Sequence, residues 1–162
     1  MKFAVLIRSR CMIRVICVGK IKEKYFTDAI KEYQKRLSKY TKLEIIEIPD
    51  FDADNINTIL KKESELILKQ IKDKSYIITL EIEGNSLSSV ELSNKIDNIL
   101  NTNSDITFII GGSYGLSDDV KKLSNYKLSF SKMTFPHQLF RVLLLEQIYR
   151  SYKILNNESY HK

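Results

Sequence analysis

Short β-branched runs alternate with amphipathic stretches along the chain, and this alternation restricts the possible folds more than any other feature. The runs with strand composition span 13–18, 43–48, 76–82, 106–110 and 126–130. Apolar residues spaced by three and four predict helices over 25–40, 56–71 and 88–100, a short helix from Ser117 and a last one from about Pro136. Strands and helices that alternate in this way form a mostly parallel sheet with helices on both faces. We therefore expect a single α/β domain over residues 12–162.

The composition agrees with one globular domain. Of the 162 residues, 43% are hydrophobic and 28% are charged, which is close to the average for soluble proteins. No apolar run approaches the ~20 residues of a membrane helix. Cys11 and Cys17 are too few and too badly spaced for a metal knuckle or a disulfide framework. We therefore expect a cytoplasmic protein with no metal and no membrane partner.

Residues 1–11 precede the first strand pattern. Their apolar run is too short for a secretion signal, and no small-residue cleavage site follows it. The absence of acidic residues before Glu23 also fits an organellar transit segment. We interpret 1–11 as an N-terminal extension or a misassigned start, with Met12 as the natural first residue.

The net charge of +6 comes from 26 Lys and Arg against 20 Asp and Glu. A basic surface is expected of a protein that meets phosphate backbones. It is equally typical of a solvated surface that keeps a protein in solution. Charge alone leaves both interpretations open.

Two loops follow strand runs in the last third of the chain, at 111–115 and 129–138. Ligands bind at the carboxyl ends of strands in open α/β sheets, so the two loops predict one pocket. Glycines in the first loop allow close approach of a ligand, although a tight turn without a ligand has the same composition. The spacing does not fit a dinucleotide fingerprint, and the next strand ends in Ser131 and Lys132 with no acid for a ribose. No Gly-Lys-Ser/Thr follows, which excludes a P-loop.

Several charged or aromatic side chains near these loops are candidates for chemistry. His137 begins the last helix and Arg141 follows on the same face, so they form a possible base and a possible phosphate ligand. A helix cap or a packing role is the alternative for His137. Glu81 and Glu83 point the same way at a strand end, where exposed charges are the simpler interpretation.

The last helix is apolar around more than half of its circumference over 139–145. A surface helix needs only one apolar stripe, so the extra face predicts a second partner. We interpret this face as a homodimer interface. Deep burial within the same domain is the alternative.

Six segments carry a resemblance to a known family: Val18–Lys20, Lys22–Tyr25, Ile78–Glu81, Ile110–Ser113, Leu128–Gln138 and Tyr160–Lys162. In order and spacing they resemble the RlmH family, SPOUT-superfamily methyltransferases of bacterial large-subunit rRNA. The resemblance runs from Met12 to Lys162. It implies a C-terminal trefoil knot, a rare exception to the rule against threaded loops, and a homodimer. It also implies that S-adenosylmethionine is used to methylate ring nitrogen 3 of a pseudouridine in 23S rRNA, on assembled ribosomes.

The resemblance also implies roles for individual positions. The expected cofactor-binding residues are Leu80, Gly111, Phe130, Ser131, Lys132, Met133, Thr134 and Phe135. His137 is then a candidate base and Arg141 a candidate stabiliser of the resulting anion or of a phosphate. Tyr160 and His161 are expected to contribute to substrate binding from the partner subunit. A catalytically silent RNA-binding dimer and another nucleotide-using enzyme remain as alternatives, although the intact loops favour catalysis.

Overall fold

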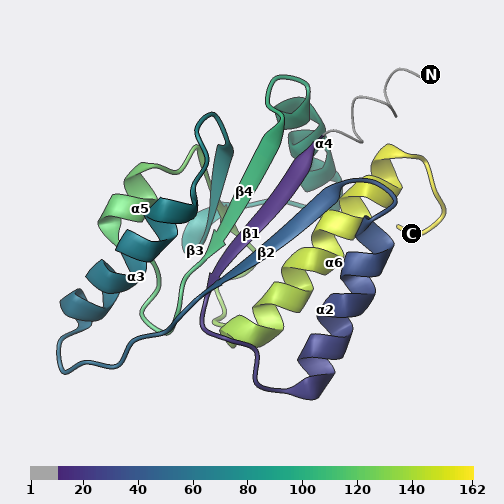
Figure 1. The fold of residues 1–162 in the computed structure, drawn as a ribbon. Coiled ribbons are helices and arrows are strands. Elements are labelled where there is room, and N and C mark those ends of the chain that lie inside the picture. Colours follow the sequence, from purple (N-terminus) through teal and green to yellow (C-terminus); the bar gives the residue numbers. More distant parts are fainter. Residues whose placement is uncertain (1–10) are drawn as a thin grey trace.

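The computed structural model describes residues 11–162. The interpretation of 1–11 as an extension or misassigned start concerns, except for Cys11, residues outside the described part and stays a prediction. The elements are β1 (Met12–Val18), α2 (Lys24–Leu37), β2 (Lys42–Ile48), α3 (Ile56–Gln70), β3 (Tyr76–Ser86), α4 (Ser89–Leu100), β4 (Asp105–Ile110), α5 (Asp118–Lys122), β5 (Tyr126–Ser129) and α6 (His137–Leu155) (Figure 1).

The strands form one five-stranded sheet in the order β2-β1-β4-β3-β5, and neighbouring strands in it are parallel. Met12 of β1 lies beside Lys42 of β2 and Asp105 of β4. The central strands β1 and β4 are almost wholly buried, as expected for a parallel sheet covered on both faces. The sequence-based prediction of an α/β domain with a parallel sheet is confirmed.

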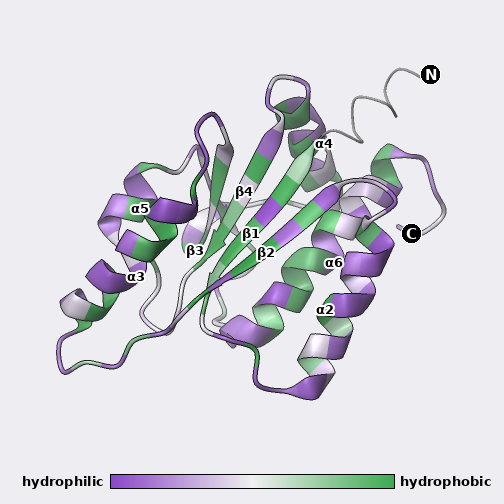
Figure 2. Cartoon of the chain, viewed as in Figure 1, coloured by the Kyte–Doolittle hydropathy of each residue, from purple (hydrophilic) through white to green (hydrophobic). Residues whose placement is uncertain are grey.

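Helices cover both faces of the sheet. Helices α3 and α5 lie on one face, and α2, α4 and α6 lie on the other (Figure 1). Each face has its own hydrophobic cluster, the larger one around Ile13, Phe108 and Leu144, the smaller around Ile16 and Ile109. Hydrophobic residues concentrate on the central strands and along α6 (Figure 2). The sequence explains this division, because neighbouring residues of a strand point to opposite faces.

Two elements differ in length from the sequence-based prediction. Helix α2 stops at Leu37, and Tyr40 instead stacks on Tyr152 of α6 with ring centroids 5.6 Å apart. Strand β3 continues beyond Ile82 to Ser86, because it pairs with β5 a second time after a register shift between Leu80 and Asn85. The extension of β3 shapes the carboxyl edge of the sheet, where the predicted loops lie.

Candidate active site

A cavity of about 800 Å³ opens at the carboxyl ends of β3, β4 and β5, beside the start of α6. Both loops that the sequence singled out form its walls. Among the predicted site residues, those that line it are Leu80, Gly111, Phe130, Ser131, Met133, Thr134, Phe135 and His137. Lys132 is exposed and is not part of the lining. The chain thus brings its two candidate loops together in one ligand-sized space.

The glycine loop is a tight turn whose geometry allows no side chain at Gly111. A Cβ atom there would lie 2.5 Å from the carbonyl of Gly115. Gly115 has φ +76°, and its N–H donates to the carbonyl of Gly112 at 3.1 Å. The tight-turn interpretation therefore accounts for these glycines, while the same turn forms one wall of the cavity.

The second loop is held in place by aromatic packing and by one hydroxyl. Phe140 of α6 meets Phe130 edge to face at 4.9 Å and stacks on Phe135 at 6.1 Å. The Ser129 hydroxyl donates to the carbonyl of Ile82 at 2.8 Å, which ties β5 to the end of β3. The loop is thus fixed at both ends, while Met133 at its tip is 74% exposed.

His137 is the first residue of α6 and reaches the cavity wall. Burial lowers the pKa of its imidazole below the usual value, and the nearby positive charge of Arg141 lowers it further. Asp50 opposes this shift, whereas Lys22 adds to it. The imidazole is therefore neutral at pH 7 and has a nitrogen that can accept a proton.

Arg141 lies one turn further along α6 and is not part of the cavity lining, because its guanidinium contacts the ends of β1 and β2. Its side chain is buried. Nη2 donates to the carbonyl of Val18 at 2.9 Å and to that of Gly19, and Nη1 contacts Oε2 of Glu47 at 2.8 Å. Both terminal nitrogens are thus committed within the protein. The predicted role of Arg141, to stabilise a substrate anion or bind a phosphate, stays a prediction. None of its described contacts supports this role.

Tyr160 and His161 lie beside the C-terminal half of α6. The Tyr160 hydroxyl donates to Glu146 at 2.9 Å, and His161 Nδ1 lies 3.3 Å from Nη1 of Arg150. Glu146 is about 14 Å along the helix axis from His137, at a rise of ~1.5 Å per residue. The structure therefore does not bring these two residues to the cavity of their own chain. Their contribution from a partner subunit stays a prediction.

Glu81 and Glu83, which the sequence analysis interpreted as exposed strand-end charges, also line the cavity. Further lining residues to which the sequence assigned no role include Ile82, Leu116, Lys121 and Phe140. Glu81 accepts a hydrogen bond from the Thr79 hydroxyl at 2.6 Å and lies 3.8 Å from Lys121 Nζ, so its charge is partly compensated. The predicted strand-end position of Glu81 and Glu83 could have identified them as cavity residues from the sequence. Phe140 could not be identified in this way, because only the packing of α6 brings it to the cavity.

The part of the chain that the structure describes contains no candidate metal site and no candidate membrane-spanning helix. Within residues 11–162, no three His, Cys, Asp or Glu side chains converge in a way that could hold a metal ion. None of the described helices combines the length and the apolar character that crossing a membrane requires.

Comparisons with known proteins agree with this architecture. A family model described as "Predicted SPOUT methyltransferase" matches residues 11–161. Two structures share the fold at low identity: a probable methylase family protein from Haemophilus influenzae (TM-score 0.57, 14% identity, 93% of this chain and 70% of that chain) and a probable methyltransferase from Bordetella pertussis (TM-score 0.59, 10% identity, 93% of this chain and 99% of that chain).

Two curated relatives are much closer in sequence. One is the "Putative ribosomal RNA large subunit methyltransferase H" of Methanococcus maripaludis, 57% identical over 157 residues. The other is the "Ribosomal RNA large subunit methyltransferase H" of Clostridium botulinum, 58% identical over 157 residues. Each alignment covers 93% of this chain and 99% of the relative. The chain is therefore a methyltransferase that belongs to the RlmH family of the SPOUT superfamily.

Proposed function

We propose that this protein is an S-adenosylmethionine-dependent rRNA methyltransferase of the cytoplasm. Its proposed target is ring nitrogen 3 of a pseudouridine in 23S rRNA, within the assembled ribosome. The observation that carries the proposal is the single cavity at the carboxyl edge of the sheet, walled by both loops of the family motif. The names of the relatives, which are 57% and 58% identical, support rRNA as the substrate.

The cavity residues fit the proposed cofactor. A volume of about 800 Å³ lies within the usual range for small-molecule sites. Leu80, Leu116 and Phe135 offer apolar surface to an adenosine, and Gly111 lets the backbone approach it closely. Glu81 and Glu83 add negative charge to the wall, which suits a ligand that carries a sulfonium and an ammonium group. When bound, the cofactor supplies an electrophilic methyl group for an in-line displacement.

The protein's part in the reaction is positioning and proton transfer. A uracil-type imide nitrogen must lose its proton to become a good nucleophile. We assign this step to His137, whose neutral imidazole at the cavity wall accepts the proton at a ring nitrogen. The loop of residues 129–136 keeps the cofactor side of the cavity in place through its contacts with Phe140.

A homodimer with a knotted C-terminal region completes the proposal. Leu139, Val142 and Leu143 of α6 remain only partly buried in the single chain, which leaves an apolar stripe for a second copy. In that arrangement, Tyr160 and His161 of one subunit serve the cavity of the other. The hydrogen bond from Ser129 to Ile82 holds β5 against the irregular part of β3 between Leu80 and Asn85, and we place the proposed knot in this region.

Calorimetry and rRNA mass spectrometry together test the proposal. We expect micromolar binding of S-adenosylmethionine to the purified protein. We also expect one methylated pseudouridine to disappear from 23S rRNA when the gene is deleted from its host. Purified enzyme should then restore the methyl group on ribosomes from the deletion strain, with much less transfer to a short free stem-loop. Absence of cofactor binding, or an unchanged set of methylated pseudouridines, would contradict the proposal.

A further inference from the structure

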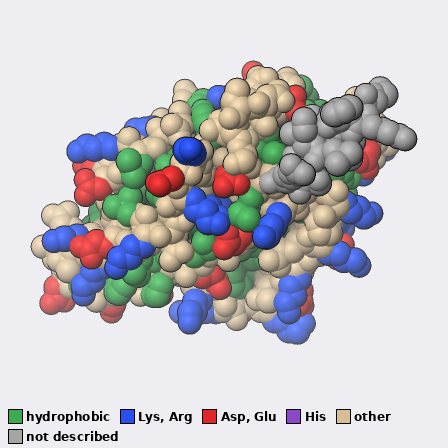
Figure 3. Space-filling view, turned by 45° about the horizontal axis from the view of Figure 1, so that its top comes forward, with side chains coloured by type: hydrophobic (Ala, Val, Ile, Leu, Met, Phe, Trp, Pro, Cys, Tyr) green, Lys and Arg blue, Asp and Glu red, His purple; other side chains and the backbone are tan. Residues whose placement is uncertain are grey.

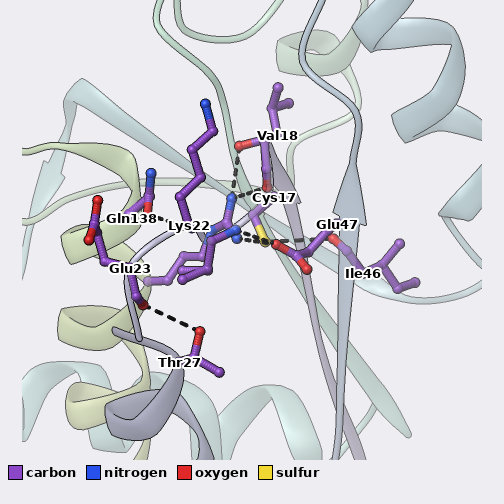
Figure 4. A network of polar contacts seen from close by, with 11 residues as sticks. Cys17, Val18, Lys22, Glu23, Thr27, Ile46, Glu47 and Gln138 are labelled. Atoms are coloured by element: carbon purple, nitrogen blue, oxygen red, sulfur yellow. Dashed lines mark hydrogen bonds and ion pairs between the residues drawn. The ribbon is translucent and has the colours of Figure 1, made fainter. Parts of the chain in front are cut away.

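The connection between β1 and α2, residues 19–23, lies mostly at the surface, yet three hydrogen bonds fix it to two other elements, β2 and α6. The N–H of Gly19 donates to the carbonyl of Ile48 at 2.6 Å, and the N–H of Ile21 donates to Oε2 of Glu47 at 2.9 Å. The N–H of Lys22 donates to Oε1 of Gln138 in α6 at 3.2 Å (Figure 4). Such bonds hold the backbone of a surface connection in one conformation.

The same connection packs against the candidate base. Gly19 has φ +89°, and a Cβ atom at this position would lie 3.2 Å from Nε2 of His137. Arg141 holds the carbonyls of Val18 and Gly19 from the buried side. The connection therefore lies against His137, which lines the cavity, and its backbone is held in place relative to the reacting groups.

Those outward side chains are basic and aromatic. Lys20, Lys22 and Lys24 are exposed, and the ring of Tyr25 is 64% exposed at the start of α2. Among the described residues, Lys24 pairs with Asp28 at 2.6 Å, whereas Lys20 and Lys22 have no ion-pair partner. The charge of Lys22 also contributes to the lowered pKa of His137. Two ammonium groups without an ion-pair partner thus belong to the segment that packs against His137.

None of the described acids, Glu23, Glu47 and Asp50 included, forms an ion pair with Lys20 or Lys22. Glu47 accepts hydrogen bonds from Arg141 and from the N–H of Ile21, so its carboxylate is occupied. Figure 3 is turned so that the end of the sheet where the strands begin comes forward. On this face, by contrast, Lys and Arg side chains are interspersed with Asp and Glu side chains. Unpaired positive charge beside the cavity complements a phosphate backbone.

We propose that residues 20–25 are the RNA-positioning element of the active site, in which Lys20 and Lys22 bind phosphates that flank the methylated nucleotide and Tyr25 stacks on a neighbouring base. This proposal rests on the proposed function of the cavity as an rRNA methyltransferase site. Phosphate contacts fix the register of a protein on RNA without reading sequence. An exposed aromatic face accepts any unstacked base. The element therefore places the target base over His137, and the cavity performs the reaction.

A double variant, Lys20→Gln with Lys22→Gln, tests the phosphate contacts. Methylation of ribosomes is measured over a series of KCl concentrations, with cofactor affinity measured by calorimetry. We expect KM for ribosomes to rise about tenfold and the slope of log(kcat/KM) against log[KCl] to become shallower by about 1.4–1.8, since each phosphate contact adds about 0.7–0.9. At saturating ribosomes, kcat and the affinity for S-adenosylmethionine should stay within about twofold of wild type.

Three further variants test whether the effect depends on the charge, on its position and on the aromatic ring. Lys20→Arg with Lys22→Arg keeps the positive charge and should retain the wild-type salt slope. Lys72→Gln with Lys74→Gln removes two exposed lysines from the turn before β3, at the opposite end of the sheet, and should change neither KM nor the slope. Tyr25→Ala should raise KM about tenfold without changing the slope, because stacking carries no counterion release.

The outcomes distinguish this proposal from the function on which it rests. An unchanged salt slope in the Lys20 and Lys22 glutamine variant would overturn the phosphate assignment. A fall in kcat with unchanged KM would also overturn it, because the lysines would then act in the chemical step. If the wild-type protein transferred no methyl group to rRNA, the proposed function would fail. Cosedimentation of the same variants with ribosomes at graded salt would still decide whether the element binds RNA.

Discussion

Nη1 of Arg141 lies 2.8 Å from Oε2 of Glu47, and this ion pair joins the start of α6 to the end of β2. The guanidinium is buried, whereas the Glu47 side chain is 38% exposed. Because Arg141 also holds the carbonyls of Val18 and Gly19, it fixes the backbone that packs against His137. Its position thus indicates a positioning role, and His137 remains the group that faces the cavity.

Arg141→Ala should destabilise the protein by about 3 kcal/mol, because it leaves two buried carbonyls and a half-buried carboxylate without their donor. Urea unfolding followed by circular dichroism measures this loss. Glu47→Gln is the matched control. Its amide oxygen can still accept from Ile21 and Arg141, so we expect a loss of only about 1 kcal/mol. Equal losses in the two variants would show that the carbonyl contacts contribute little.

His137→Gln should lower the methylation rate at least 100-fold, because general-base catalysis contributes about 10²–10⁴-fold. Affinity for S-adenosylmethionine should not change. A methylation rate close to wild type with normal cofactor binding would refute the assignment of the base.

The pH dependence gives a second test of the same residue. Burial and Arg141 lower the pKa of His137 below 6.5, and the base must be neutral to accept a proton. Activity should therefore be constant above about pH 7 and fall as pH drops through a value below the ordinary 6.5. An NMR titration of the imidazole, assigned with the His137→Gln variant, should give the same pKa as the acid limb. An acid limb that persists in the variant would belong to another group.

The sequence predicted the elements of the fold well, since each β-branched run became a strand and the helix predicted over 88–100 is α4, which begins with a Ser88–Glu91 capping box. Local patterns succeeded because strand and helix periodicity reflect which face is buried. They did not place Arg141. Its spacing from His137 puts both residues on one helix face, but its partner Glu47 is distant in sequence and is brought close only by the packing of α6 on the sheet.

The shape of the cavity was predictable only in part, for a similar reason. The two loops were identified from strand ends and from the family resemblance. The wall formed by Ile82 and Glu83 depends on the second pairing of β3 with β5, at Asn85 and Ser86. Such a register shift leaves no periodic signal in the sequence, because it is set by the partner strand.

Gly111→Ala should weaken cofactor binding by about tenfold or more. The added Cβ would lie 2.5 Å from the Gly115 carbonyl, so the turn must open and move the cavity wall. Calorimetry with S-adenosylmethionine measures the change. Tyr114→Ala, at a position of the same loop that is 53% exposed and is not part of the cavity lining, is the control and should bind within about twofold of wild type. Normal binding by Gly111→Ala would show that the cofactor does not contact this turn.

Leu143→Glu should disrupt the proposed homodimer. Leu143 belongs to the partly buried stripe of α6, and a carboxylate there would lose its hydration in an interface between two copies. We expect wild type to sediment as a dimer and the variant as a monomer at micromolar concentration. The matched control is Leu68→Glu, because Leu68 is 36% exposed on α3, on the opposite face of the sheet, and this variant should remain dimeric.

The same variant tests whether the active site needs both subunits. The Leu143→Glu monomer should keep its cavity and bind S-adenosylmethionine, because the single chain already forms a cavity of about 800 Å³ with both candidate loops. It should lose at least about 90% of its methylation activity, since Tyr160 and His161 lie beside the far half of α6 in their own chain and would reach a cavity only from a partner. A fully active monomer would show that these two residues take no part in the reaction.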